Sequence, residues 1–574
     1  MQDFTAVMLT ASKYLLVVFS AIILIRCLRS MLSQRFESET WGFVRAGKES
    51  IPVTHWENII GRAPTADIRI DKPGVGRTHA ILVRSDKGVW RIFDVFSRGE
   101  VWVNGELVGR KGSVLESGDY VNLSGSTVRF RDMSTEKRAQ LEQQRTSAGA
   151  RVSPALTLFD LTVFQALLLL QHAINAASGD AGIIALAFAT LIILEWCLYN
   201  AMRTIGRTGF ECETLAFYLT TLGMSVAATS TPQDLFKQIL LVIASVLLFL
   251  LMGWWLRNLR RAKAMRVPIA IAALALMAVN VAAGSTAFGA QNWLVIGGYS
   301  FQPSELVKVA YIYCGASALD TLYRRNNLFV FIAFSAICVI ALALIGDFGT
   351  ALIFFMTFLV ISFMRSGSIA TVFLAVTGAA LACFLVLTVK PYIAQRFSTW
   401  GHVWEDVYNT GYQQTRAMSA AASGGLFGKG AGAGWLKTVF AANTDMVFAM
   451  ICEELGLIIA VCAVMSILTL AFFAVRSARH SRSSYYAIAA CATVSMLLVQ
   501  LALNVFGSMD LLPFTGVTFP FVSRGGTSLI SCWMMMAFIK AADTRRDASF
   551  VVRAVTKLKN ENDDYDEDEE AEEE

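Results

Sequence analysis

The stretch LFKQILLVIASVLLFLLMGWWLRNLRRAKAMR, residues 235–266, decides the class of fold. Its first part is almost wholly apolar and long enough to cross a bilayer as a helix, which takes about 20 residues. Lys and Arg then crowd the end of the stretch. Positive charge beside a spanning helix favours the cytoplasmic side. The stretch therefore predicts a transmembrane helix whose C-terminal end faces the cytoplasm.

Apolar runs of this kind recur along the chain. The 574 residues are 55% hydrophobic and 16% charged, a balance that excludes an ordinary soluble protein. Besides a first run near 5–27, the runs lie near 154–177, 181–203, 210–228, 234–257, 267–287, 303–321, 327–346, 350–365, 368–390, 446–473, 484–507 and 525–541. The sequence predicts an α-helical polytopic membrane protein with about 13 spanning helices.

The charges between the runs predict the orientation. The first run has its positive charges after it and no basic segment before it, so we expect residues 1–30 to be an uncleaved anchor helix with its N-terminus outside. Threading the chain from there places the basic loops inside, as the positive-inside rule requires. The large loop 390–445 is then outside.

The remaining segments differ in composition. Residues 40–132 alternate apolar and polar positions in short stretches separated by turn signals, which predicts an inserted cytoplasmic all-β sandwich. A charged linker at 133–153 leads to the polytopic domain at 154–541. The end, 542–574, finishes in NENDDYDEDEEAEEE, and we expect a disordered cytoplasmic tail.

Cysteine and histidine indicate no metal site. The ten cysteines are scattered, mostly within apolar runs, without paired spacing, and the five histidines form no HExxH pattern. We predict no metal site, no disulfide framework and no nucleic-acid partner.

Four stretches resemble the SEDS family (shape, elongation, division and sporulation proteins of the FtsW, RodA and SpoVE type). They are NWLVIGGYSFQPSELVKVA (292–310), GDFGTAL (346–352), SGGLFGKGAGAG through NTDMVFAMICEELG (423–456) and LLPFTGVTFPFVSRGGTSL (511–529). They follow the family's order and cover most of 270–541.

The resemblance implies an enzyme of bacterial cell-wall synthesis. Such a protein is a peptidoglycan glycosyltransferase that polymerises lipid II at the outer face of the cytoplasmic membrane, in elongation, cell shape or division. It works with a transpeptidase, a class B penicillin-binding protein. No cofactor is evident, and a divalent cation is the one addition left open.

Asp445 is the candidate catalytic residue. It stands at the outer end of an apolar run, and the resemblance matches it to the family's catalytic acid in an HTD-F-F context. A base is needed for the acceptor hydroxyl, and partial burial would raise a carboxyl pKa toward the working pH. The alternative is a helix N-terminal cap, and both roles can coexist.

Cations are needed for the departing diphosphate. We assign Arg396, in QRFSTW, and Lys429, in FGKG, because Arg suits bidentate phosphate contacts and Lys a point-charge contact. The Gly-rich stretch around Lys429 either lets backbone N–H groups approach the same oxygens or is a flexible loop. From the same motifs, Ser423, Thr444 and Ser523 are assigned to substrate contacts.

Four further acids and a lysine interrupt apolar sequence. Glu305 and Lys308 are three apart on a helix and can pair, either as a structural ion pair or at the substrate. Asp347 binds substrate or a cation, or caps a turn. Glu453 and Glu454 are interpreted as interior pairing groups, because neither is on the face of Asp445.

The chain departs from the family's pattern at several positions. The usual His before Thr-Asp is Asn443, and the usual Tyr of SYGGSS is Arg524. Asn292 replaces an Arg or Lys before Trp, and Ile345-Gly346 replaces Gln-Pro before Asp347.

The insert resembles a forkhead-associated (FHA) domain, which binds phosphothreonine through its loops. The match runs through IIGRAPTADIRIDKPGVGRTHAIL, DVFSRGEVWVNGE and LESGDYVNL. It assigns a phosphothreonine partner to Arg62, Arg77, Ser97 and Asn104, although Gly76 and Gly99 replace a Ser and an Asn of the pattern. The alternative is a docking module that needs no phosphate.

Two other functions stay open from the sequence. A flippase for the lipid-linked precursor predicts an inverted repeat and helices broken at the midplane, and no repeat is evident. A catalytically weak, FHA-regulated scaffold for a transpeptidase is compatible with the departures at 292 and 443.

Overall fold

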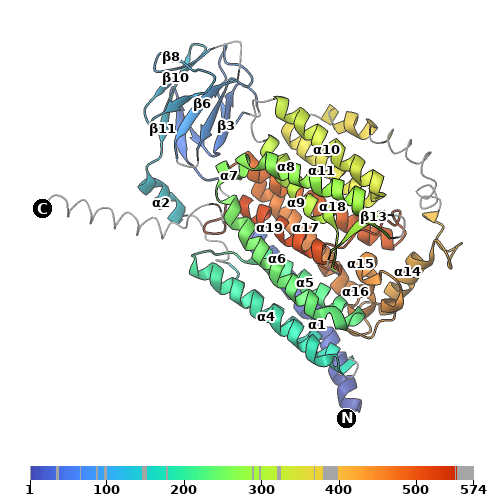
Figure 1. Cartoon of the computed structure of the whole chain (residues 1–574). Coiled ribbons are helices and arrows are strands. Elements are labelled where there is room, and N and C mark those ends of the chain that lie inside the picture. The colour runs from blue at the N-terminus through green and yellow to red at the C-terminus, as the bar shows by residue number, and fades with distance from the viewer. Residues whose placement is uncertain are drawn as a thin grey trace.

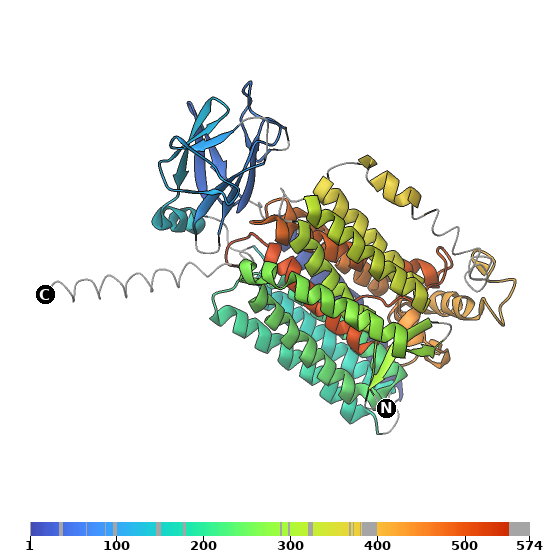
Figure 2. The same ribbon diagram turned by 45° about the horizontal axis from the view of Figure 1, so that its top comes forward.

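The protein consists of a β-sandwich at one end of a bundle of long helices (Figure 1). The computed structural model describes residues 2–33, 38–64, 66–85, 88–95, 100–144, 151–175, 179–287, 290–296, 299–319, 325–366, 369–370, 372–378, 380, 399–549 and 551. The N-terminus lies at the end of the bundle away from the sandwich, as do α14, α15 and α16 (Figures 1 and 2).

The β-sandwich is built from two sheets, as the alternating sequence predicts. One has the strand order β2-β1-β11-β10-β7-β8 and the other β4-β3-β5-β6-β9. The strands are β1 (Gly42–Ala46), β2 (Glu49–Val53), β3 (Glu57–Gly61), β4 (Ile68–Arg69), β5 (Ala80–Arg84), β6 (Trp90–Asp94), β7 (Val101–Val103), β8 (Glu106–Leu107), β9 (Ser113–Leu115), β10 (Tyr120–Leu123) and β11 (Ser126–Asp132). Their inward side chains, among them Trp90 and Phe130, are buried between the sheets.

The helices follow the apolar runs closely. They are α1 (Gln2–Ser33), α2 (Thr135–Gln144), α3 (Pro154–Asn175), α4 (Ala181–Thr204), α5 (Glu211–Ser230), α6 (Leu235–Leu256), α7 (Leu259–Ala264), α8 (Arg266–Ala283), α9 (Pro303–Leu319), α10 (Arg325–Ile345), α11 (Phe348–Ser366), α14 (Tyr412–Gly424), α15 (Ala442–Asp445), α16 (Val447–Leu455), α17 (Leu457–Ala478), α18 (Ser484–Ser508) and α19 (Gly526–Ala542). Within the described residues, seven are long and apolar enough to cross a membrane and three more are shorter apolar helices. The predicted polytopic membrane fold is confirmed, while the count of 13 remains a prediction.

Two local features differ from the hydropathy pattern. The apolar run 446–473 is not one helix, because Gly456 has φ +94° and separates α16 from α17. The segment before α9 forms a small antiparallel sheet of β12 (Ser285–Ala287), β13 (Ala290–Ile296) and β14 (Tyr299–Phe301). Hydropathy reports burial in lipid and carries no signal for either feature.

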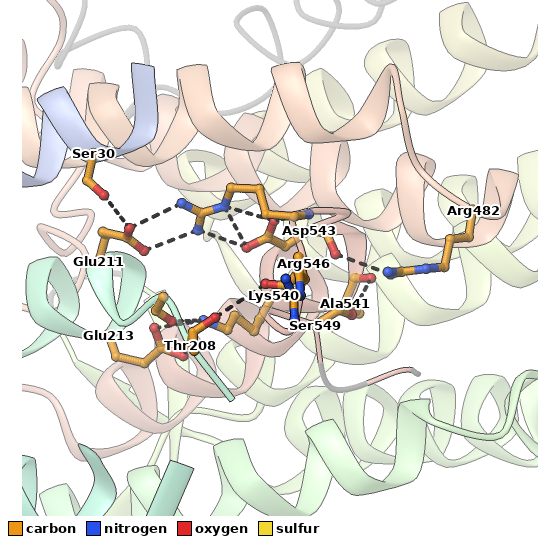
Figure 3. A network of polar contacts seen from close by, with 12 residues as sticks. Ser30, Thr208, Glu211, Glu213, Arg482, Lys540, Ala541, Asp543, Arg546 and Ser549 are labelled. Carbon is orange, nitrogen blue, oxygen red and sulfur yellow. Dashed lines mark hydrogen bonds and ion pairs between the residues drawn. The ribbon is translucent and has the colours of Figure 1, made fainter. Parts of the chain in front are cut away.

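The start of the C-terminal segment corrects the prediction of disorder from residue 542 onward. Arg545 is buried between Glu211 of α5 and Asp543, with guanidinium-to-carboxylate distances of 3.1 and 2.9 Å. Ser30 of α1 also donates to Glu211, and Lys540 pairs with Glu213 (Figure 3). Burying charge is tolerated here because each charge has an opposite partner. The acidic residues from 552 on lie outside the described part of the chain.

The β-sandwich is docked on the loop between α17 and α18. Arg482 of this loop makes a bidentate ion pair with Glu39, with both N–O distances 2.6 Å. The buried Glu57 of β3 accepts from Ser484 N and Ser483 Oγ, the first residue and the N-cap of α18. An acid suits this place because a helix N-terminus carries partial positive charge. These contacts hold the sandwich in a fixed position on the bundle.

Candidate active site

The candidate catalytic residue, Asp445, ends the four-residue helix α15 and is half-buried. α15 is preceded by Ala441 in the left-handed conformation, φ 57°, which turns the chain sharply into it. The three carbonyls at its end are each held by another segment. Asn443 O accepts from Arg524 N at 2.8 Å, Thr444 O from Ser523 Oγ at 2.5 Å, and Asp445 O from Asn504 Nδ2 at 3.1 Å. Asp445 thus stands on a fixed backbone.

Asn504 joins α18 to both sides of this site. Its Nδ2 donates to Asp445 O and, at 2.8 Å, to Val517 O, in the loop between α18 and α19. Gly516, next to Val517, has φ +68°, and a Cβ atom there would lie 3.2 Å from Asp445 Oδ2. The loop therefore runs past the carboxylate with no side chain at its nearest point. Nothing in the sequence singles out Asn504 among the several polar residues of the apolar run 484–507.

Glu453 and Glu454 hold the Gly-rich loop, as their interpretation as interior pairing groups predicts. Glu453 accepts from Lys429 Nζ at 3.0 Å, from Trp435 N at 3.0 Å and from Leu436 N at 2.9 Å. Glu454 Oε2 accepts from Gly432 N at 3.0 Å and from Thr229 Oγ1 at 2.9 Å, the latter on α5. The two acids satisfy backbone donors that would otherwise be buried without partners.

These contacts correct one hypothesis about the Gly-rich loop. The main-chain N–H groups of Lys429 and Gly430 donate to the carbonyls of Glu453 and Glu454, and Ala431 N donates to Gln171. With those of 432, 435 and 436 also engaged, these groups are not available to diphosphate oxygens. Lys429 itself is paired with Glu453, so its assignment to the diphosphate now competes with a structural role.

Glu305 and Lys308 form the predicted ion pair on α9. Their Oε1 and Nζ atoms are 2.8 Å apart and both side chains are almost completely buried. Ser531 of α19 donates to the other oxygen of Glu305 at 2.9 Å. Because both charges are enclosed and satisfied, the pair braces α9 against α19.

Asp347 caps helix α11, one of the alternatives considered for it. Its Oδ1 accepts from Thr350 N at 2.9 Å, the N-terminal capping contact. Its Oδ2 accepts from Asn292 Nδ2 at 3.0 Å and from Gln302 Nε2 at 3.4 Å. Asn292, a departure from the family's pattern, therefore serves as a neutral donor to this buried acid.

The other assigned residues have the following positions. Ser423 Oγ donates to Ala420 O within α14, and Thr444 Oγ1 donates to Ala441 O. Ser523 is buried and braces Thr444, which makes it a supporting residue beside Asp445. Arg396 lies outside the described residues.

Two loops of the β-sandwich that carry residues assigned to phosphothreonine are hydrogen-bonded to each other. Arg62 N donates to Gly76 O and Ala63 N to Arg77 O, and the side chains of Arg62 and Arg77 are exposed. Asn104 is engaged within the domain: its Oδ1 accepts from Tyr120 N, and its Nδ2 donates to Asp119. Ser97 lies outside the described residues.

Residues 211–548 match the family model described as a cell cycle protein, that of FtsW, RodA and SpoVE, and residues 58–124 match the FHA domain. The chain belongs to the FtsW/RodA/SpoVE family. The matched region of this family member contains Asp445 and every residue described above that contacts it, and the FHA domain is a separate addition to it.

Curated relatives of this FtsW/RodA/SpoVE-family protein have names that agree. The chain is 29% identical to peptidoglycan glycosyltransferase RodA of Mycobacterium tuberculosis over 53% of this chain and 69% of the relative. It is 30% identical to the probable peptidoglycan glycosyltransferase FtsW of Escherichia coli O157:H7, over 50% and 70%. It is 33% identical to stage V sporulation protein E of Bacillus subtilis, over 42% and 68%.

Solved structures also resemble the family member. A chain from work on coordinated polymerization and crosslinking by a peptidoglycan synthase complex matches with 24% identity and a TM-score of 0.48, over 58% of this chain and 98% of that one. RodA of Thermus thermophilus matches with 23% identity and a TM-score of 0.43, over 57% and 94%. Among the described residues, no three His, Cys, Asp or Glu side chains are grouped to hold a metal ion.

Proposed function

We propose that this protein is a peptidoglycan glycosyltransferase that polymerises lipid II, with Asp445 as the general base. The names of its relatives support the reaction class. The observation that carries the residue assignment is the support of three successive carbonyls around Asp445 by Arg524, Ser523 and Asn504. A catalytic base has to be held in place to act, and this site holds the backbone while leaving the carboxylate half-exposed.

The proposed step is a displacement at the anomeric carbon of the lipid-linked sugar. The acceptor hydroxyl oxygen forms the new glycosidic bond as its proton passes to Asp445. The bond from the anomeric carbon to the phosphate oxygen breaks, and its electron pair leaves with the polyprenyl diphosphate. Gly516 places no side chain against the carboxylate, where a Cβ atom would lie 3.2 Å from Asp445 Oδ2.

Purified full-length protein, supplied with lipid II and its transpeptidase partner, tests this function. We expect Asp445→Asn to lose at least about 10²-fold in glycan polymerisation, the usual contribution of a general base. Asp406→Asn, which changes a half-exposed acid of the loop before α14, is the control and should polymerise normally. Unchanged polymerisation in Asp445→Asn would refute the assignment.

The sidedness belongs to the same proposal. We place the FHA domain and the acidic tail in the cytoplasm and Asp445, with the loop 390–445, outside the plasma membrane of a bacterium. The separation of the sandwich and α15 at opposite ends of the bundle supports this (Figure 1). An impermeant maleimide applied to intact cells should label Tyr408→Cys and spare Lys48→Cys, and the reverse pattern would overturn the orientation.

We also propose two partners, a class B penicillin-binding protein and a phosphothreonine-containing protein bound by the FHA domain. The exposed Arg62 and Arg77, on loops tied together by hydrogen bonds, are suited to a phosphate. Arg62→Ala should lose capture of a phosphothreonine peptide, while Arg45→Ala, a change on β1 of the other sheet, should retain it. Equal capture by both variants would favour a docking module that needs no phosphate.

A further inference from the structure

Arg524 lies beside the candidate base and stands where the family's pattern has Tyr. Its main-chain N–H donates to Asn443 O, two residues before Asp445. The preceding residue, Ser523, donates to Thr444 O. The arginine is therefore anchored to the same short helix that carries Asp445.

The side chain of Arg524 reaches the opposite wall of the site. Its Nη2 pairs with Asp234, in the 3-10 turn η1 (Pro232–Asp234) between α5 and α6. The side chain remains 30% exposed. A guanidinium has five N–H donors, and within the described part of the chain one of them makes this contact, so others can reach a ligand.

The side chains around Asp234 carry more positive than negative charge. Lys237 Nζ is 3.0 Å from the other oxygen of Asp234 and is 63% exposed. Two cations thus share one carboxylate, which leaves one net positive charge at this corner. The corner also adjoins the first residue of α19, Gly526, where the partial positive charge of a helix N-terminus adds to the potential.

We propose that Arg524, with Lys237 nearby, binds the diphosphate of the lipid-linked donor. This rests on the proposed function, because the ligand is its leaving group. As the bond to the anomeric carbon breaks, the departing polyprenyl diphosphate gains negative charge, and a guanidinium can hold two of its oxygens at once. Lys429 is less suited to this role, since Glu453 already neutralises it.

Binding of farnesyl diphosphate, a short soluble polyprenyl diphosphate, to the purified full-length protein tests the inference without turnover. We expect Arg524→Gln to weaken binding about tenfold, which corresponds to one charge-assisted contact, and Arg524→Lys to weaken it less. Arg416→Gln is the matched control. Arg416 lies on α14 at the same end of the bundle, with its guanidinium 5.3 Å from the Tyr412 ring, and its loss should leave binding unchanged.

Asp234→Asn separates this role from a structural one. If Arg524 binds phosphate, removing the carboxylate frees the guanidinium, and farnesyl diphosphate should bind as well as before or more tightly. If Arg524 only pins the corner between α5 and α6, Asp234→Asn and Arg524→Gln should lower the melting temperature and the affinity alike, and that result overturns the inference.

The inference and the proposed function can fail separately. Wild-type KM for lipid II in Arg524→Gln, in a protein that polymerises, refutes the diphosphate site and leaves the function intact. Binding of farnesyl diphosphate that depends on Arg524, in a protein that makes no glycan, refutes the function and leaves the site intact. Farnesyl monophosphate should bind more weakly than the diphosphate, since it offers fewer anionic oxygens.

Discussion

Replacing Glu453 with Gln should destabilise the Gly-rich loop and, through it, the candidate base. Glu453 Oε1 accepts from Lys429 Nζ and Trp435 N, and Oε2 accepts from Leu436 N. The glutamine side chain has one oxygen and one NH2 group, so the NH2 group must face at least one of these three donors. We leave the contact with the partly exposed Lys429 out of the energy, because solvent screens it.

The magnitude follows from the Leu436 contact. A hydrogen bond to a charged acceptor contributes about 1.5–3 kcal/mol, and a buried donor left without a partner brings the loss to about 3 kcal/mol. In a chain of this size we expect the melting temperature to fall by about 2–3 °C. Polymerisation should fall about tenfold, because the loop leads directly into α15.

Glu454→Gln is the matched control for this measurement. Both hydrogen bonds of Glu454 fall on Oε2, while Oε1 is buried without a partner among the described residues. A glutamine oxygen can keep both bonds, so the melting temperature should change by less than about 1 °C. Thermal unfolding of the detergent-purified proteins compares the two variants. Equal losses in both would refute this account of the loop.

Three further predictions concern other parts of the molecule. Asn504→Leu should lower kcat about tenfold or more and leave KM for lipid II nearly unchanged, because it frees the backbone of Asp445; a change in KM alone would contradict this. Lys308→Met should reduce the melting temperature and the yield through an unpaired buried Glu305, at a cost of about 3–5 kcal/mol, and adding Glu305→Gln should restore part of the loss; no recovery would contradict it. Burial lowers the pKa of His79 from 6.5, so the FHA domain should keep its full stability above that pH and lose stability as the pH falls below it. Hydrogen exchange of the β5 amides measures this loss. Exchange rates that do not depend on pH, after correction for the intrinsic rate, would contradict the prediction.

The sequence was most informative where one residue type carries the signal. Long apolar runs predicted the helices, alternation predicted the sandwich, and the spacing of Glu305 and Lys308 predicted their ion pair. Glu453 and Glu454 were recognisable as interior groups because free charge is costly between apolar residues.

The supports of Asp445 could not be found in the same way. Asn504 lies 59 positions from Asp445 in the chain, and a contact over that separation depends on how helices pack. The hydrogen bonds that occupy the Gly-rich loop also come from main-chain groups, which every residue possesses. Composition therefore could not show whether that loop offered its N–H groups to a ligand or to Glu453 and Glu454.

The attachment of the FHA domain to the helix bundle affects how the role of the domain should be studied. Glu57 accepts a hydrogen bond from Ser484 at the start of α18, and Asn504 near the other end of that helix donates to Asp445 O. At 1.5 Å per residue, Ser484 and Asn504 are about 30 Å apart along the helix. Deleting the domain would remove Glu57 and leave the start of α18 without the carboxylate that accepts from its first residue. Loss of activity in such a truncated enzyme would therefore result from the disturbed helix α18 and would not show that a bound partner regulates the enzyme. Only a change confined to the loops of Arg62 and Arg77, such as Arg62→Ala, separates the role of the domain in binding a partner from its role in supporting the helix bundle.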